Sequence, residues 1–209
     1  MKIYDISMNI HHDMMVYKNK EEKRPVLNNV QNFINSSAYE SRISMDMHTG
    51  THVDAPLHMI EEGSTIETLD LNTVITKCKV LDLTNVHNTI MREDLIKKDI
   101  QKGDFIILKT RNSNTEEFDF DFVYLEKSGA EYLKEKEVKG VGTDGLGIER
   151  SQPNHETHKI LMEAGITIVE GLRLKDISEG SYVLCAPPLK IKGAEAAPTR
   201  ALLIEGITL

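Results

Sequence analysis

Apolar residues along the chain gather into short runs of strand length, separated by polar segments. Between positions 42 and 47 the two kinds alternate, with Ile43, Met45 and Met47 on one side, which predicts a half-buried strand. Ile3 marks a short strand near the N-terminus. Further strands are predicted at 79–83, 105–110, 138–141, 166–170, 182–185 and 201–205.

Helix signals lie between these runs. Three helices are predicted: 92–98 after a Thr89 cap, a helix opened by the capping box of Ser128 and Glu131 that ends near Lys136, and one started by Ser151 and Pro153 and stopped by Gly165. The strands are too many for one wound, wholly parallel sheet. The pattern therefore predicts an α/β fold with a mixed sheet.

One long segment, 11–40, is polar and aperiodic for longer than a normal connection between elements. Loops of this length often cover a substrate. We expect the same role here.

Composition indicates one domain over 1–209 and a small-molecule substrate. The 209 residues, 40% of them hydrophobic, suffice for a core without disulfides. The net charge of −8 disfavours partners that carry phosphate, such as nucleic acids and anionic membranes. No apolar run approaches the roughly 18 residues of a membrane span, and the N-terminus lacks a signal-peptide pattern, so we expect a cytoplasmic protein. Cys78 and Cys185 lie in apolar runs and are expected to be buried and inert.

The candidate chemistry lies in one short segment that contains His48, His52, Asp54 and His58. Imidazole nitrogens and a carboxylate together suit zinc or manganese better than calcium. The alternative is a loop with exposed histidines, but three of the eight histidines fall within eleven residues around an aspartate. The segment therefore predicts a metal site.

The geometry of this segment requires a bend. A straight strand would spread His48 and Asp54 over about 20 Å, too far for one ion or an adjacent pair. Gly50 lies between the first two histidines and permits an unusual turn. Pro56 should end the extended conformation, which leaves His58 beyond the ligands and within reach of a substrate.

Further ligands must come from elsewhere, because a hydrolytic ion needs about three protein ligands and an open position. If a helix containing His158 reverses into the strand 166–170, His158 and Glu170 end roughly level. His155 lies on the same helix face and is the rival, and a packed, non-ligating histidine is the plain alternative. Asp144 and Glu149, beside a glycine-rich turn, are interpreted as local hydrogen-bonding groups, with contact to a metal or substrate as the alternative.

The run His48-Thr49-Gly50-Thr51-His52-Val53-Asp54-Ala55-Pro56-Leu57-His58 resembles the HxGTHxDxPxH signature of the cyclase family, whose best-known members are bacterial kynurenine formamidases. The resemblance extends over nearly the whole chain. His158 and Glu170 keep the spacing of the family's later ligands, and 188–200 resembles its C-terminal segment.

The resemblance implies a swivelling β/β/α fold and an arylformamidase-type hydrolase of tryptophan catabolism, assembled as a homodimer or homotetramer whose neighbouring subunits close the pocket. It also implies two divalent ions, zinc or manganese, and an activated water that attacks the amide of N-formylkynurenine or a similar formamide. The implied roles are metal ligation by His48, His52 and Asp54, bridging of the two ions by Asp54 and Glu170, ligation of the second ion by His158, and acid/base catalysis by His58.

Two departures from the family pattern bear on the substrate. Similar formamidases carry a tryptophan near the N-terminal loop, where this tryptophan-free chain has Met14-Met15-Val16-Tyr17. Tyr17 would stack on an aromatic substrate instead. The segment Gly193-Ala194-Glu195-Ala196-Ala197-Pro198 also differs from the aspartate and serine that the family more usually has at that place. The alternatives are opening of a cyclic amide such as an isatin-like ring, and a non-catalytic metal-binding protein.

Overall fold

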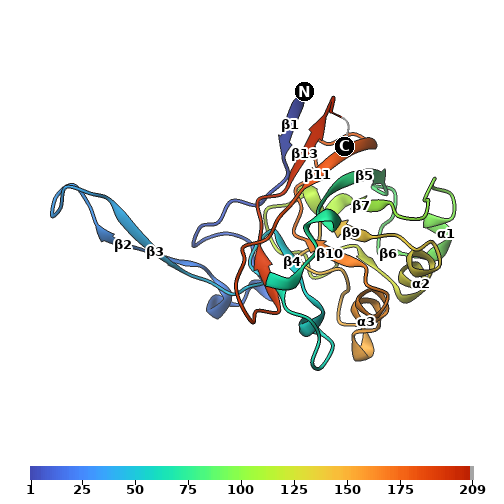
Figure 1. Cartoon of the computed structure of the whole chain (residues 1–209), viewed down its shortest axis with the longest axis horizontal. Helices are drawn as coiled ribbons and strands as arrows, with labels where there is room; N and C mark the ends of the chain where they lie inside the picture. The colour runs from blue at the N-terminus through green and yellow to red at the C-terminus, as the bar shows by residue number, and fades with distance from the viewer. Residues whose placement is uncertain (208–209) are drawn as a thin grey trace.

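A mixed sheet of nine strands forms the body of the computed structural model, which describes residues 1–207 (Figure 1). Its strands are β1 Lys2–Asp5, β4 His52–Asp54, β5 Ile75–Asp82, β7 Phe105–Lys109, β9 Gly140–Thr143, β10 Thr167–Glu170, β11 Gly180–Cys185, β12 Ala196–Pro198 and β13 Leu202–Glu205. They lie in the order β1-β13-β11-β5-β7-β9-β10-β4-β12. The central strands β5, β7, β9 and β10 are parallel, and the flanking pairs are antiparallel. The α/β fold with a mixed sheet is confirmed.

Three α-helices pack on one side of this sheet: α1 Arg92–Leu95, α2 Lys127–Glu135 and α3 Glu156–Glu163 (Figure 1). Both faces of the sheet are covered at the central strand β7, whose first four residues are fully buried. Ile106 and Leu108 join the core cluster that contains the helix residues Leu95, Leu133 and Leu161. The alternate β7 side chains join a second cluster on the opposite face. Such a strand needs the unbroken apolar run that predicted it.

Short elements connect the larger ones. β6 Thr89–Ile90 pairs with β8 Tyr124–Leu125, and the 3-10 turns are η1 Tyr17–Asn19, η2 Glu21–Lys23, η3 Pro56–His58, η4 Ile66–Thr68, η5 Leu71–Thr73, η6 Arg111–Asn114 and η7 Pro153–His155. Within residues 1–207 no helix is long and apolar enough to cross a bilayer.

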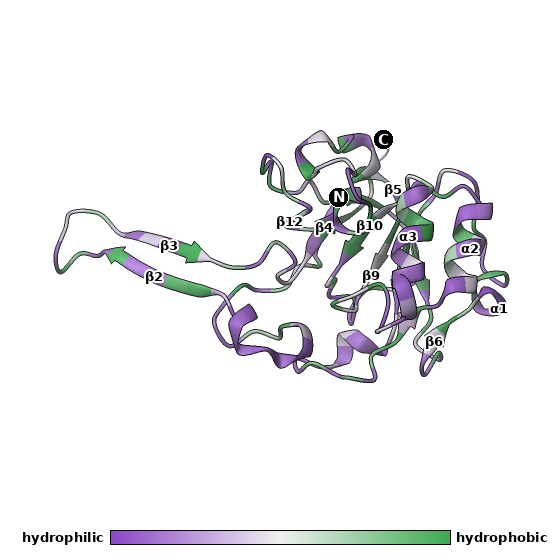
Figure 2. Ribbon diagram, turned by 90° about the horizontal axis from the view of Figure 1, so that it is seen from below, coloured by the Kyte–Doolittle hydropathy of each residue, from purple (hydrophilic) through white to green (hydrophobic). Residues whose placement is uncertain are grey.

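A separate two-stranded hairpin, β2 Val26–Gln31 and β3 Glu40–Ser44, extends away from the body (Figure 1). The prediction that 11–40 lacks regular structure is therefore wrong for β2. The predicted strand at 42–47 is confirmed only for residues 42–44, because β3 lies at 40–44, and the predicted half-burial is wrong, because all five residues of β3 are exposed. Alternation predicted a buried face, yet no other layer of the described chain packs on this hairpin (Figure 2).

Element ends differ from the predicted ones where side chains cap in unexpected ways. α1 is shorter than 92–98, and Thr89 lies in β6 rather than acting as its cap. α2 begins before Ser128, because the carboxylate of Glu126 accepts the Ser128 N–H at 2.8 Å and caps the helix. The predicted ends at Lys136 and Gly165 are confirmed, and Gly165 has a φ of 71°.

Candidate metal centre

Pairing of β4 with β10 places three side chains on one face of the sheet. The antiparallel register sets His52 opposite Glu170, and Asp54 shares strand parity with His52. His52 Nε2 lies 3.4 Å from Glu170 Oε2 and 3.4 Å from Asp54 Oδ1. The Glu170 carboxylate is oriented by the backbone N–H of Ile148, which donates to Oε1 at 2.5 Å. Two carboxylates and an imidazole thus converge from adjacent strands.

The bend predicted at Gly50 is confirmed and adds a second imidazole. Gly50 has a φ of 65°, and the turn before β4 carries His48 back so that its Nδ1 lies 3.0 Å from Asp54 Oδ1. Gly171, with a φ of 69°, packs so closely on the Gly50 carbonyl that a Cβ at this position would overlap it. The turn is therefore held between two glycines.

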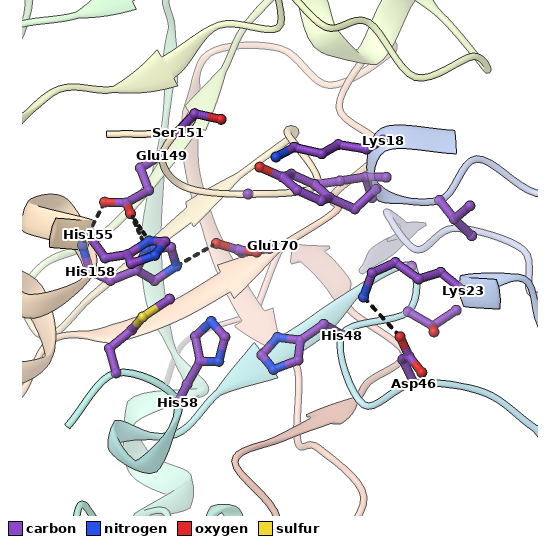
Figure 3. Close-up of a pocket in the computed structure, with 17 residues that line it drawn as sticks. Lys18, Lys23, Asp46, His48, His58, Glu149, Ser151, His155, His158 and Glu170 are labelled. Carbon is purple, nitrogen blue, oxygen red and sulfur yellow. Dashed lines mark hydrogen bonds and ion pairs between the residues drawn. The ribbon is translucent and has the colours of Figure 1, made fainter. Parts of the chain in front are cut away.

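The helix-to-strand reversal from α3 to β10 adds the third imidazole. His158 Nε2 lies 3.4 Å from Glu170 Oε1 and 3.7 Å from Asp54 Oδ2, so the predicted levelling of His158 and Glu170 is confirmed (Figure 3). His155 instead directs its Nδ1 to Glu149, 2.6 Å away, and its side chain is 55% exposed. The structure therefore favours His158 over His155 as a member of the centre.

Each of the three imidazoles also has its second nitrogen directed at an oxygen. His52 Nδ1 lies 2.9 Å from the Gly50 carbonyl, His158 Nδ1 lies 3.3 Å from Glu149 Oε1, and His48 Nε2 lies 3.5 Å from Glu195 Oε1. A carbonyl oxygen can only accept, so His52 Nδ1 donates to it, and Nε2, which faces the carboxylates, is the nitrogen that a metal would take in place of a proton. This arrangement is typical of histidines that bind a metal through the other nitrogen.

Glu149 has a larger role than the local one expected from sequence. Its Oε2 accepts the N–H of Thr157 at 3.0 Å, which anchors the start of α3, while Oε1 faces His158. For Asp144 the local interpretation is confirmed, because it accepts the Thr110 N–H at 2.9 Å and the Thr110 hydroxyl at 2.7 Å. The turn thus contains one purely structural carboxylate and one that contacts a candidate ligand.

Glu195 lies in the segment 193–198 that departs from the family pattern, and the sequence indicated no role for it. It precedes β12, which pairs with β4, and its carbonyl accepts the Ala55 N–H at 2.8 Å. That contact brings its carboxylate to His48. Only the pairing of β12 with β4 reveals this proximity, because the two residues are far apart in the chain.

The electrostatics of the cluster suit a cation. Burial would lower the pKa of His52, but Asp54 and Glu170 raise it to about 10. Burial and the charge of Asp54 would raise the pKa of Glu170, but contacts with His158 and His52 lower it to about 2. Within residues 1–207 no lysine or arginine forms an ion pair with either carboxylate. Two buried carboxylates therefore lie together with imidazoles as their nearest positive partners.

Unpaired polar atoms show that these residues fit a metal. The buried side-chain atoms that face the centre without a hydrogen-bond partner are His52 Nε2 and both carboxylate oxygens of Asp54. Leaving such atoms unpaired is costly, and a bound divalent ion would remove much of that cost. One group of possible ligands is His52, Asp54 and Glu170, and another contains His48, Asp54 and His58. The donor set of nitrogens and carboxylate oxygens matches zinc or manganese.

A cavity of about 300 Å³ opens beside this cluster, with His58 in its wall (Figure 3). His58 ends η3, the turn that Pro56 begins, as expected. Its ring centroid lies 4.1 Å from that of His48 and 5.5 Å from that of His158. Burial lowers the pKa of His58, which keeps the ring neutral at neutral pH.

Tyr17 lines the same cavity, although it lies far from the histidines in the sequence. Its ring packs edge-on against Phe118 with centroids 5.3 Å apart. Lys18 and Lys23 also border the cavity, and Lys23 pairs with Asp46 at 3.0 Å (Figure 3). The Lys18 ammonium has no carboxylate partner within residues 1–207 and lies 5.2 Å from the Tyr17 ring centroid. The cavity thus has one end formed by the candidate metal ligands and another with an aromatic ring and an ammonium group.

Known proteins share both the sequence and the architecture. The family model Cyclase, described as "Putative cyclase", matches residues 4–150. Cyclase-like protein 3 of Arabidopsis thaliana is 33% identical over 98% of this chain and 80% of its own length. The kynurenine formamidase of Salinibacter ruber is 30% identical over 97% of each chain.

Solved structures extend the comparison to the fold. A structure titled as a potential metal-dependent hydrolase with cyclase activity superposes with a TM-score of 0.93 at 49% identity, covering 99% of both chains. Isatin hydrolase A from Labrenzia aggregata has the same fold, with a TM-score of 0.85 at 21% identity, over 98% of this chain and 94% of its own. The match to the family model and the identity with curated members agree with the motif, and the chain belongs to the cyclase family.

Proposed function

We propose that this protein is a metal-dependent hydrolase of small amides, with His48, His52, Asp54, His158 and Glu170 as its ligands. The observation that carries the proposal is the convergence of three imidazoles and two carboxylates, nearly all buried, at one end of the cavity. Two zinc or manganese ions, with Asp54 and Glu170 between them, would satisfy the whole set. Such ions supply an activated water near neutral pH and polarise the carbonyl that it attacks.

His58 is proposed as the acid/base that passes a proton to the departing amine. Its ring contacts His48 and His158 but comes from a different turn, so it remains available to a substrate. Being neutral at neutral pH, it can accept a proton from the attacking water before releasing it to the amine. Proton transfer of this kind contributes about 10²- to 10⁴-fold in rate.

N-formylkynurenine or a similar aromatic formamide is the proposed substrate. Several relatives that match over most of the chain are kynurenine formamidases, and others are cyclase-like proteins. Tyr17 offers a face or edge to an aromatic ring, and the Lys18 ammonium suits a carboxylate on the substrate.

Ring opening of an isatin-like cyclic amide is the second candidate. It is favoured by the absence of tryptophan from the chain and by the shared fold with isatin hydrolases. A neutral ring would use Tyr17 but not Lys18. Lys18→Met should therefore raise KM for N-formylkynurenine while leaving KM for isatin unchanged, if both are substrates.

The function is tested by measuring bound metal and turnover together. Asp54→Ala should lose metal by elemental analysis after gel filtration, and His58→Ala should keep metal but lose most activity. His87→Ala, at an exposed histidine outside the cavity, is the matched control. Stoichiometric metal in Asp54→Ala would refute the ligand assignment, and full activity in His58→Ala would refute its role. Metal binding without hydrolysis of formanilides, cyclic amides or lactones would instead indicate a non-catalytic metal-binding protein.

Cytoplasmic localisation and a homodimeric or homotetrameric assembly belong to the same proposal. Cell fractionation and light scattering on the purified protein test them.

A further inference from the structure

His155 is a cavity residue that neither the candidate metal ligands nor the proposed acid/base accounts for. It lines the cavity, and its side chain is 55% exposed. Its Nδ1 lies 2.6 Å from Glu149 Oε1 (Figure 3). Among residues 1–207 no side chain or backbone group forms a hydrogen bond or an ion pair with the other ring nitrogen, Nε2. The ring is therefore held at one nitrogen and available to a ligand at the other.

The backbone of the turn 151–155, which carries this ring, is held in an uncommon conformation. Ser151, Asn154 and His155 have φ values of 53°, 60° and 53°, all in the left-handed region. Residues other than glycine rarely adopt this conformation, and each costs free energy that the rest of the fold must supply. Such residues gather at ligand-binding sites, where they hold side chains in place. Ser151 and His155 both line the cavity, so the strained turn presents side chains to a ligand.

Glu149 determines what kind of ligand Nε2 can bind. Its Oε2 accepts the backbone N–H groups of Thr157 and His158 at 3.0 and 3.3 Å, which favours the ionised carboxylate. An ionised carboxylate only accepts hydrogen bonds, so His155 Nδ1 donates to it. In the neutral ring Nε2 then carries a lone pair and accepts. The ligand of His155 is therefore a hydrogen-bond donor.

The charge behind the ring favours a donor that is positively charged. Within residues 1–207 the ion-pair partners of Glu149 are His155 and His158, and no lysine or arginine neutralises its carboxylate. A carboxylate that polarises the imidazole strengthens the hydrogen bond that Nε2 accepts, most of all from a cation. An ammonium group on a small molecule meets both conditions.

We propose that His155 binds an ammonium group of the substrate through Nε2, and that the pair of Glu149 and His155 makes the cavity selective for amides that carry one. The inference rests on the proposed function, because it concerns the substrate of the same site. The ring centroids of His155 and His158 are 6.4 Å apart, so one small molecule can place an amide at the ligands and an ammonium group at His155. Lys18 borders the same cavity and suits a carboxylate. The substrate class is then an amide that carries an amino-acid head group.

A pair of small molecules tests this selectivity without turnover. Kynurenine, the product expected from N-formylkynurenine, is compared with its analogue in which hydrogen replaces the α-ammonium group. Isothermal titration calorimetry on metal-loaded protein should give a Kd about tenfold lower for kynurenine, because it gains one charge-assisted hydrogen bond.

Variants of the turn separate the imidazole from the backbone that carries it. His155→Asn should reduce the preference to about twofold or less, because asparagine tolerates the left-handed backbone but is too short to place an acceptor at the position of Nε2. His155→Gly adopts the same backbone without strain and should give the same loss. Asn154→Gly is the matched control, because Asn154 lies on the same strained turn but not in the cavity wall, and it should keep the preference.

Equal Kd values in the wild type, or no measurable binding of kynurenine to it, would overturn the proposal. So would an unchanged preference in both His155 variants. An equal loss in Asn154→Gly would also overturn it, because the effect would then belong to the turn rather than to the imidazole. Metal content and hydrolysis of formanilide, which has no ammonium group, are measured separately on the wild type, so failure of the proposed function is distinguishable from failure of this inference.

Discussion

Glu149 offers the sharpest test of how the metal centre is built, because it contacts a candidate ligand without belonging to the central cluster. Its Oε1 lies 3.3 Å from His158 Nδ1 and holds that ring so that Nε2 faces Glu170 and Asp54. Removing such a supporting carboxylate typically costs 10- to 100-fold in metal affinity, or about 1.4–2.8 kcal/mol.

Glu149→Gln should weaken metal binding by about tenfold, the lower end of this range. The amide oxygen can still accept the Thr157 N–H, so the start of α3 is preserved, but the charge that favours a proton on His158 Nδ1 is lost. The other two imidazoles keep their own supports at Gly50 and Glu195. Competition with a chelating dye for zinc, and separately for manganese, measures the change.

Asp144→Asn is the matched control, because this buried carboxylate lies on the same turn but bonds only to residues outside the centre. It should lower thermal stability and leave metal affinity within twofold of wild type. Unchanged affinity in Glu149→Gln, or an equal loss in both variants, would refute the reasoning that Glu149 acts through His158.

Three further predictions concern the surroundings of the centre. Gly171→Ala should lower thermal stability and metal affinity together. The new Cβ would be strained by the left-handed backbone and would overlap the Gly50 carbonyl, which accepts from His52. A wild-type melting temperature and metal content in this variant would contradict the prediction. In metal-free protein, the raised pKa of His52 stabilises the fold fully below pH 6.5, and this stabilisation is lost as the pH rises to about 10. The free energy of unfolding should fall by about 1.4 kcal/mol per pH unit for the one proton involved. Metal-loaded protein should show the opposite trend with pH, and urea unfolding across this range measures both. Cys78 is 3% exposed and burial raises its pKa to about 12, whereas Cys185 is only half-buried, contrary to expectation. A thiol reagent at pH 7.5 should therefore label Cys185 in folded protein and Cys78 only after unfolding. Rapid labelling of both cysteines in folded protein would refute the packing described around β5.

The close grouping of the candidate ligands was predictable because local geometry determines most of it. Donors at 48, 52 and 54 can converge only if the chain bends, and Gly50 is the residue that permits the bend. The helix-to-strand reversal made the proximity of His158 and Glu170 calculable from rise per residue alone.

Contacts that depend on strand order were not predictable in the same way. Glu195 reaches His48 because β12 pairs with β4, and no local pattern encodes that pairing. The hairpin of β2 and β3 was not predicted, for a different reason. Residues 26–31 are rich in amides, which hides a strand from a reading of apolar alternation, and β3 alternates without having a buried face.

The pairing of His52 with Glu170 across β4 and β10 has a consequence for the tolerance of this chain to insertions and deletions. Adding or removing one residue within either strand would turn the subsequent side chains to the opposite face and separate the carboxylates from the imidazoles. A residue added in the turn between β2 and β3 would leave that register untouched. Length variation among descendants of this sequence should therefore collect in this hairpin, while β4 and β10 keep a constant length.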